Sequence, residues 1–295
     1  MLIVNMHFTP NIKLMGFVSY PHPWLHFKRN VNEYILYFIK SGELHIQENG
    51  IPYVLKKGDL LLLEPNLDHS GIQEHICDYY YIHFEHSDIQ NVKTEDPLSV
   101  AQRYLIEQEP EQPREDSQAC YFPKTCTLSK KGFHQALHSM NEMLQLYKRK
   151  NFNRMLTALK FSEFLIDVSR DHFLSELQEP GNSRTKSYIK VHDLLDYIHE
   201  HYPSKITSAE IEQQFECNYD YINRVFTRLT GDPIMRYVNK VRINHARELI
   251  EATHLSFYEI GYLTGLNDPF YFSKVFKKYV GMSPKQYYKT IREDH

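Results

Sequence analysis

Three lysines near the C-terminus recur at helical spacing and could bind an anionic surface. Lys274, Lys277 and Lys278 lie three or four residues apart, so a helix would place them on one face, with Phe270 and Ser273 toward its N-terminal end. The opposite face would carry a buried apolar stripe, made of Phe272, Val275, Phe276 and Tyr279. A short helix that is buried on one side and cationic on the other suits docking in the major groove of DNA.

The residues before this helix predict a tight turn. Gly265 stands where a preceding helix over 259–263 must end in a left-handed conformation, which glycine adopts without strain. Asp268 can cap the next helix, and Pro269 suits the first helical position because that N–H would have no partner anyway. The stretch 256–292 is therefore predicted to be a helix-turn-helix followed by a closing helix.

The same unit occurs a second time upstream. Val225-Phe226 precedes Val275-Phe276 by 50 residues. Glu210-Ile211 precedes Glu259-Ile260 by 49, so the second turn holds one extra residue. The exposed face of the first unit is polar and cationic, with Asp220, Asn223, Arg224 and Arg228. Its turn, 216–218, contains no glycine.

A helix is predicted to join the two units. Asp232-Pro233 provides the same cap-and-proline start, and the apolar pattern continues to about Glu251. Such a helix is about 28 Å long at about 1.5 Å per residue. Successive major grooves on one side of DNA lie about 34 Å apart, so a rigid rod of this length could place both units on one side of a duplex.

The C-terminal stretch EIGYLTGLNDPFYFSKVFKKYVGMSPKQYYK, residues 259–289, resembles the signature of the AraC/XylS family of transcription regulators. The resemblance implies an all-α DNA-binding domain with two helix-turn-helix units over 188–295. It further implies promoter half-sites in double-stranded DNA, a homodimer, and RNA polymerase as a partner. We expect five residues to contact base edges, namely Asp220, Asn223, Arg224, Phe270 and Lys274. We expect three others to contact phosphates, namely Arg228, Lys277 and Lys278.

Charge is distributed unevenly along the 295 residues. The formal net charge is −3, which by itself does not indicate a nucleic-acid-binding protein. Within 221–292, however, twelve lysines and arginines oppose five aspartates and glutamates, which leaves this stretch at +7 and the rest of the chain at −10. This asymmetry favours an acidic sensing part attached to a basic DNA-binding part.

Short β-branched and aromatic runs fill the N-terminal part and predict strands. They cover 34–39, 43–48, 52–56, 59–65 and 79–84, with a hairpin signal at Asn49-Gly50. Many short strands at this spacing favour a small barrel or jelly roll. The segments GELHIQENG and GDLLLLEPNLDH resemble the cupin-type barrel of AraC-like regulators. The fold class is therefore α+β multidomain, a cupin-like β-barrel with a helical segment followed by the all-α domain.

The barrel is predicted to hold a small-molecule effector, with a sugar as one candidate. Aromatic rings can stack on the C–H face of a sugar, while arginine and histidine bond its hydroxyls. The candidate contacts are Trp24, His26, Arg29, His69, Ser70, Tyr79 and Tyr81. Strand alternation puts Tyr79 and Tyr81 on one face and Tyr80 on the other. The alternative is that these residues are packed core or rim.

No metal or other cofactor is predicted. Metal-dependent cupins carry an HxH pair with a downstream Glu, and a further His in their second motif. Here the first motif offers His45 followed by Gln47, and the second offers His69. Two dispersed histidines make a poor set of three or four ligands.

Four cysteines, Cys77, Cys120, Cys126 and Cys217, show no metal-type spacing. Free thiols in a reducing cytosol are the expectation, with a redox switch through Cys120 and Cys126 as an alternative. No apolar run is long enough to span a membrane, and the N-terminus does not resemble a secretory signal. A cytoplasmic location is expected.

Residues 96–178 are predicted to be irregular at first and then helical from about Leu128. The helical part shows a wide apolar face, with Leu156, Leu159, Phe161, Phe164, Leu165 and Val168. This face could pack on the barrel, on a second copy of the protein, or on both. The predicted domains are thus a barrel over 1–95, this segment, a linker over 179–187 and the DNA-binding domain.

These features together predict a ligand-responsive, sequence-specific DNA-binding regulator, most simply an activator of a carbohydrate or small-metabolite operon. It is not expected to be an enzyme. Two alternatives stay open at this point. One is a metal-dependent cupin enzyme fused to a DNA-binding tail, and the other is a DNA-binding protein that responds to no ligand.

Overall fold

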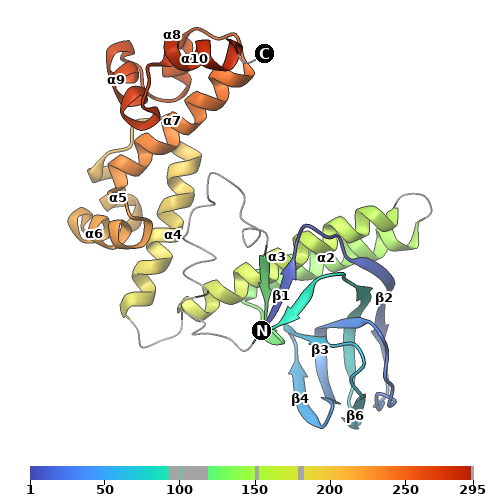
Figure 1. The fold of residues 1–295 in the computed structure, drawn as a ribbon. Coiled ribbons are helices and arrows are strands. Elements are labelled where there is room, and N and C mark those ends of the chain that lie inside the picture. Colours follow the sequence, from blue (N-terminus) through green and yellow to red (C-terminus); the bar gives the residue numbers. More distant parts are fainter. Residues whose placement is uncertain (93–99, 101–118, 150–152, 179–182, 294–295) are drawn as a thin grey trace. The chain divides into compact units, whose positions relative to one another are not determined.

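The computed structural model describes residues 1–92, 100, 119–149, 153–178 and 183–293. The chain forms two compact units (Figure 1). One, the barrel unit, holds Met1–Ala101 and Glu109–Glu176, and the other, the helical unit, holds Gln102–Gln108 and Leu177–His295. Most of the predicted irregular segment and residues 179–182 of the predicted linker lie outside the described residues.

Antiparallel strands build the barrel unit. They are β1 (Leu2–Asn5), β2 (Asn11–Ser19), β3 (Tyr34–Glu48), β4 (Ile51–Lys56), β5 (Asp59–Leu63), β6 (His69–Gln73), β7 (Cys77–Glu85), β8 (Ile89–Asn91), β9 (Ala119–Phe122) and β10 (Thr125–Thr127). The order β8-β1-β9 forms a small sheet, and the order β10-β5-β3-β7-β2, with β4 and β6 paired to β3, forms a larger one. The predicted β-barrel class is confirmed.

Strand β3 organises the larger sheet because it pairs with four others. Its first half pairs with β5 and β7, and its second half pairs mainly with β4 and β6. The sequence predicted two separate strands here. One continuous strand runs through instead, with an irregular register between Ile39 and Ser41 and a positive φ of 75° at Gly42. A Cβ at Gly42 would lie 2.1 Å from the Ile76 carbonyl oxygen, so glycine is required. The β3–β4 hairpin turns through Asn49 and Gly50 as predicted, both with positive φ.

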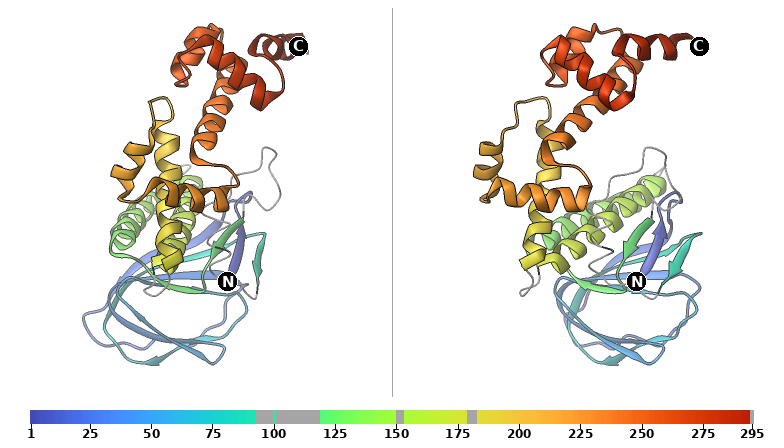
Figure 2. Two further views of the ribbon diagram at one scale, coloured as in Figure 1. Left: turned by 90° about the vertical axis from the view of Figure 1, so that its left-hand side faces the viewer. Right: turned by 60° about the vertical axis from the view of Figure 1, so that its left-hand side comes forward.

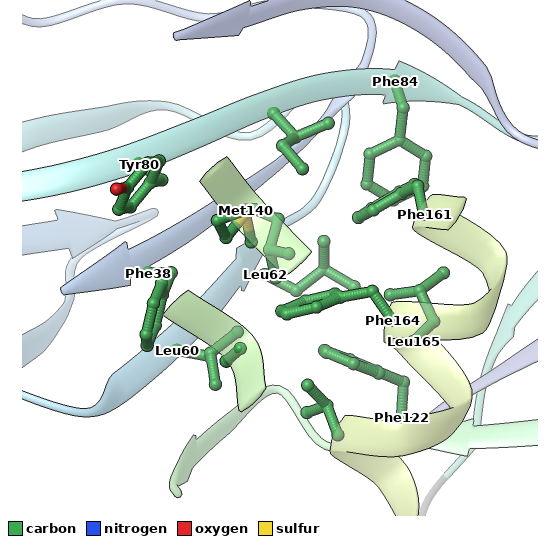
Figure 3. Packing of buried hydrophobic residues seen from close by; sticks show 14 of the residues in the cluster. Phe38, Leu60, Leu62, Tyr80, Phe84, Phe122, Met140, Phe161, Phe164 and Leu165 are labelled. Carbon is green, nitrogen blue, oxygen red and sulfur yellow. The ribbon is translucent and has the colours of Figure 1, made fainter. Parts of the chain in front are cut away.

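Alternation along these strands separates two cores. Phe38, Leu62 and Tyr80 face a cluster covered by helices α2 (Lys130–Lys148) and α3 (Asn153–Gln178). Figure 3 shows this cluster, in which Phe161 and Phe164 of α3 meet the strand residues. The opposite faces of the strands pack inside the barrel around residues such as Tyr37, Leu61 and Tyr79. The predicted division between Tyr80 and its two neighbours is confirmed.

The apolar face predicted on α3 is divided between two environments. Phe161, Phe164, Leu165 and Val168 are buried against the barrel. Leu156 and Leu159 remain 42% and 48% exposed, together with Met155 at 55%. Packing on the barrel therefore accounts for the C-terminal part of the face and leaves the N-terminal part exposed in a single chain.

Seven helices form the described part of the helical unit. They are α4 (Ser183–His201), α5 (Ser208–Phe215), α6 (Tyr219–Thr230), α7 (Ile234–Ala252), α8 (Phe257–Leu263), α9 (Pro269–Val280) and α10 (Pro284–Glu293). Helix α4 thus begins inside the predicted linker. In the part of the chain that the structure describes, no helix combines the length and apolarity needed to cross a membrane.

Helix α7, drawn in orange in Figure 2, contributes residues to two small cores within this unit. Its first half packs Tyr237 and Val241 with residues of α4, α5 and α6. Its second half packs Ala246 and Ile250 with residues of α8, α9 and α10. The predicted duplication is confirmed, because α6 and α9 start 50 residues apart and α5 and α8 start 49 apart.

Candidate nucleic-acid interface and ligand site

Helix α6 presents the exposed face predicted for the first unit. Ile222, Val225 and Phe226 are buried in the first core. Asp220, Arg224 and Arg228 are exposed. Asn218 caps the helix, since its side chain accepts a hydrogen bond of 3.1 Å from Tyr221 N. The helix therefore places an arginine-bearing face in solvent on a rigid, capped element.

Helix α9 presents the corresponding face of the second unit. Phe272, Val275 and Phe276 are buried, while five predicted contact residues are exposed, namely Phe270, Ser273, Lys274, Lys277 and Lys278. Asp268 accepts a hydrogen bond of 2.6 Å from Tyr271 N, and Pro269 occupies the first helical position, as predicted. Phe270 is 87% exposed, which is unusual for a large apolar side chain and suits contact with a partner.

Both turns take a left-handed residue at the same position of the repeat. Gly265 has a φ of 74°, as predicted, and Glu216 has a φ of 47° although it carries a side chain. Lys190 supports the first turn, since its Nζ donates to the carbonyls of Phe215 and Glu216 at 2.6 and 3.0 Å. A cation at these last carbonyls of α5 offsets the negative end of the helix.

The helix that enters each turn begins with a capping box. Thr207 and Glu210 exchange side-chain and backbone hydrogen bonds at the start of α5, and Ser256 and Glu259 do the same at the start of α8. The sequence pattern of Ser or Thr followed three residues later by Glu is the signal that could have located both helix starts.

Asn223 has a different partner from the one expected. Its side-chain Oδ1 accepts a hydrogen bond of 2.9 Å from Ile234 N, the first residue of α7. This bond satisfies a backbone donor that the helix itself leaves without a partner. Asn223 therefore connects two helices of the first unit through its Oδ1, and the base contacts proposed below do not include it.

The predicted cap of α7 is wrong in detail. The residue before the helix is Pro233, which makes no side-chain cap, and Asp232 instead forms an ion pair of 3.1 Å with Arg236. Asn223 takes over the capping role. The length of α7 agrees with expectation, because its 19 residues span about 28 Å.

Hydrogen bonds cross between the two halves of the helical unit. Arg242 of α7 donates from Nε to Tyr202 O at 2.8 Å and from Nη2 to Ser204 O at 2.7 Å. Tyr279 of α9 donates to Arg236 O at 2.9 Å. These bonds connect α7 to the segment after α4 and to α9. They therefore restrain the positions of the two helix-turn-helix units relative to α7.

A polar cluster around Arg29 lies at one end of the barrel interior. Arg29 donates from Nε to His69 Nε2 at 3.0 Å and from Nη2 to His83 Nε2 at 3.2 Å and to the Tyr37 hydroxyl at 3.3 Å. Tyr37 also bonds His26 Nε2 at 2.9 Å. The structure therefore brings together three of the predicted ligand residues, His26, Arg29 and His69.

Burial keeps the histidines of this cluster neutral. It lowers the pKa of His26 and that of His69 to about 4 each, with the nearby Arg29 charge acting in the same direction. Burial lowers the pKa of His83 as well, against the opposing effect of the hydrogen bond that His83 donates to the Glu33 carboxylate. Buried Tyr37 has its pKa raised by desolvation. The guanidinium is thus surrounded by uncharged acceptors.

The aromatic candidates flank this cluster. Trp24 stacks on Tyr79 with ring centroids 5.8 Å apart and lies 5.7 Å from the His26 ring. Tyr81 lies 5.7 Å from the ring of His83. Ser70 does not join them, because it pairs across the sheet with Gln47, whose amide donates to its hydroxyl at 3.0 Å. Ser70 and His69 point to opposite faces of β6, so Ser70 is withdrawn from the predicted ligand set.

Sequence reasoning missed Tyr37 and His83. The signal for His83 was present, because it continues the alternation of Tyr79 and Tyr81 on the inner face of β7. Tyr37 sits in the apolar run of β3, where a single hydroxyl gives no sign of its partners. Its role depends on the segment that carries His26 and Arg29 folding over β3.

One group of potential metal ligands occurs among the described residues, and it includes His45 but not His69. Glu43, His45 and His75 offer ligand atoms within 4.8 Å of one another. The rings of His45 and His75 stack in parallel, 3.7 Å apart, so their in-plane lone pairs do not converge on one ion. Glu43 is held by Lys56 at 3.3 Å and by His45 at 3.2 Å. We assign no metal to this group.

Cys77, Cys126 and Cys217 are free thiols, and the Cys120 thiol donates a hydrogen bond of 3.6 Å to Leu165 O. Cys120 and Cys126 are buried on strands of different sheets, β9 and β10. Burial raises the pKa of the Cys126 thiol to about 12, which leaves it protonated and unreactive at neutral pH. The structure does not favour the alternative of a redox switch through this pair.

Both units match known families. Residues 17–146 match the AraC-like ligand binding domain, and residues 212–290 match a helix-turn-helix domain. The chain is 27% identical to YisR, an uncharacterised HTH-type transcriptional regulator of Bacillus subtilis, over 90% of this chain and 89% of the relative.

Two further relatives are named as regulators of operons. The Msm operon regulatory protein of Streptococcus mutans is 27% identical over 89% of this chain and 86% of its own length. The melibiose operon regulatory protein of Escherichia coli is 33% identical over 55% of this chain and 52% of its own length.

Proposed function

This chain belongs to the AraC/XylS family of transcription regulators, and we propose that it activates a carbohydrate or small-metabolite operon in response to an effector. The carbohydrate part of the proposal is supported by the name of one relative, the melibiose operon regulatory protein. We infer a cytoplasmic protein that needs no cofactor and catalyses no reaction.

The observation that carries the proposal is the pair of capped helices, α6 and α9. Each buries one face and exposes cationic side chains on the other. In the proposed complex Arg224 and Asp220 read base edges in one major groove, and Lys274 and Phe270 do so in the next, with Ser273 beside them. Arg228, Lys277 and Lys278 bind phosphates and supply the salt-dependent part of the affinity.

The proposed mechanism is a shift between two arrangements of a dimer. Effector binding in the barrel changes how the barrel unit and α3 hold the two DNA-binding units, and so changes which half-sites the dimer spans and whether RNA polymerase is recruited. The exposed apolar residues of α3, Met155, Leu156 and Leu159, are the proposed contact with a second copy.

DNase footprinting on genomic fragments tests the DNA-binding part. We expect protection of two adjacent major grooves on one side of the duplex at specific sites, with affinity that falls as salt rises. Uniform binding to all fragments contradicts the proposal. Repeating the footprint with a panel of sugars and metabolites tests the response, since an effector must change the half-sites protected or the affinity.

A further inference from the structure

The Arg29 guanidinium has donors that no acceptor in the described residues uses. It carries five N–H groups, of which Nε donates to His69 and Nη2 donates to His83 and Tyr37. Nη1 makes no hydrogen bond in the part of the chain that the structure describes. Two donors on a cation at the end of the barrel interior are therefore available to a ligand.

The acceptors around Arg29 carry no negative charge. His69 accepts through Nε2 and His83 does likewise, while the Nδ1 of His83 donates to the Glu33 carboxylate at 2.5 Å. His26 donates from Nδ1 to Phe27 O at 2.9 Å and accepts the Tyr37 hydroxyl at Nε2. Each ring thus has one protonated nitrogen and one lone pair, which is the neutral form.

The nearby carboxylates are bonded to other groups. Glu33 lies on the far side of His83 from the guanidinium, and Asp68 pairs with Lys28 at 2.9 Å and with the Asn30 amide at 2.8 Å. In the described residues no carboxylate lies within ion-pair distance of Arg29. A partly buried guanidinium without a carboxylate is a strong site for an oxyanion, which it can bind through two parallel N–H groups.

A second donor in the same region also has no acceptor. The Nε1 of Trp24 is buried and makes no hydrogen bond within the described residues. Buried indole N–H groups usually have a partner. The Trp24 ring lies next to His26 and Tyr79, and His26 bonds the same Tyr37 hydroxyl as Arg29, so two contacts connect the indole to the guanidinium.

We propose that the effector is an anionic small molecule, a sugar acid, a sugar phosphate or a similar metabolite, whose oxyanion group binds at Arg29 Nη1 with Trp24 Nε1 as a further donor. This inference rests on the proposed role of the barrel as the effector-binding unit. A neutral sugar would leave the charge of Arg29 without a counterion, whereas a carboxylate or phosphate would neutralise it.

The single tryptophan provides a direct test on the full chain. Its one indole N–H resonance is followed by NMR while sodium phosphate or sodium acetate is added, with sodium chloride at matched ionic strength as reference. Glucose, glucuronate and glucose 6-phosphate are then compared, since the three share a ring and differ in the anionic group. We expect the two anionic sugars to shift the resonance at concentrations at least about tenfold lower than glucose does.

Variants show whether Arg29 is responsible. Arg29→Gln should weaken binding of the anionic probe about tenfold or more, and Arg29→Lys should retain part of it. Lys57→Gln is the matched control, because it removes an exposed cation of the same unit that lies over the Phe133 ring, outside this cluster, and it should leave binding unchanged. If none of the anions shifts the wild-type resonance beyond the effect of chloride, or if Arg29→Gln binds them equally well, the anion site is overturned.

The two levels of the proposal fail separately. Arg29-dependent anion binding that never alters the DNA footprint keeps the anion site and removes the effector role. A neutral sugar that alters the footprint equally in wild type and in Arg29→Gln keeps the regulator and removes the anion site.

Discussion

The two helix-turn-helix units share one backbone plan and differ in what supports it. Both turns place a left-handed residue at the same repeat position, Glu216 in the first and Gly265 in the second. A Cβ on Gly265 would lie 2.5 Å from the Pro203 carbonyl oxygen, whereas Glu216 is exposed and its carbonyl is bonded by Lys190. A glycine is thus required where the turn packs against another segment, and is dispensable where it faces solvent.

The closing helices differ in a related way. Ile234 begins α7 with an N–H that needs an acceptor, and Asn223 of α6 provides it. Pro284 begins α10 and has no N–H, so the residue equivalent to Asn223, which is Ser273, stays exposed. Proline at the first position of α10 thus removes a backbone donor, and the Ser273 side chain of α9 stays available for other contacts.

The largest expected effect is a difference in stability between variants of the two turns. Gly265→Ala should lower the free energy of unfolding of the helical unit by about 3 kcal/mol, because it adds left-handed strain and a close contact with Pro203. Glu216→Ala should change it by less than about 1 kcal/mol, since the strain is already present. Urea denaturation followed by far-UV circular dichroism measures both. Equal losses for the two variants would contradict the difference in packing.

The next effect concerns sequence reading by the first unit. Arg224→Ala should lose about 1–3 kcal/mol of discrimination at one base pair, because a bidentate contact between arginine and a guanine edge contributes about this much. Binding-site selection from a randomised pool measures this. Identical preferences for wild type and Arg224→Ala would remove Arg224 from the set of base-reading residues.

Asn223 and Ser273 occupy equivalent positions of α6 and α9, so replacing each with alanine tests whether the following helix needs a side-chain acceptor. Asn223→Ala should cost about 1–2 kcal/mol of stability, because it leaves the Ile234 N–H without its acceptor. Ser273→Ala should cost less than about 0.5 kcal/mol. The same denaturation measurement applies to both. A stable Asn223→Ala variant with altered sequence preference would restore Asn223 as a base contact.

The smallest effect is expected at the phosphate contacts of the second unit. Lys278→Ala should weaken binding to all DNA sequences alike and reduce the slope of log K against log salt by about 1. Fluorescence anisotropy over a salt series measures the slope. A loss confined to one sequence would place Lys278 at a base edge instead.

Features that depend on neighbours in the chain were predictable. The repeat of 49 and 50 residues, the cap at Asp268 and the left-handed Gly265 follow from helical spacing and from the conformations that each residue tolerates. The inner face of β7 followed from alternation. Asn49-Gly50 located a hairpin because both residues tolerate positive φ.

Features that depend on partners far away in the sequence could not be predicted. Asn223 caps a helix that begins eleven residues later, and Ser70 accepts the Gln47 amide because β6 pairs with β3 in one particular register. Tyr37 and His83 join Arg29 only because the segment before β3 crosses the barrel end. The continuous β3 required knowledge of its four partner strands.

Helix caps, turns and helical faces depend on residues close together in the chain. The sequence alone therefore predicted two capped helices with cationic faces, and a connecting helix about as long as the spacing of successive major grooves. Contacts between segments far apart in the chain decide which polar side chains hydrogen-bond within the protein and which can bind a ligand or DNA. Only the tertiary structure shows that Asn223 Oδ1 accepts the Ile234 N–H and that Arg29 Nη1 has no acceptor among the described residues. The reason is that packing in three dimensions determines which hydrogen-bonding groups meet.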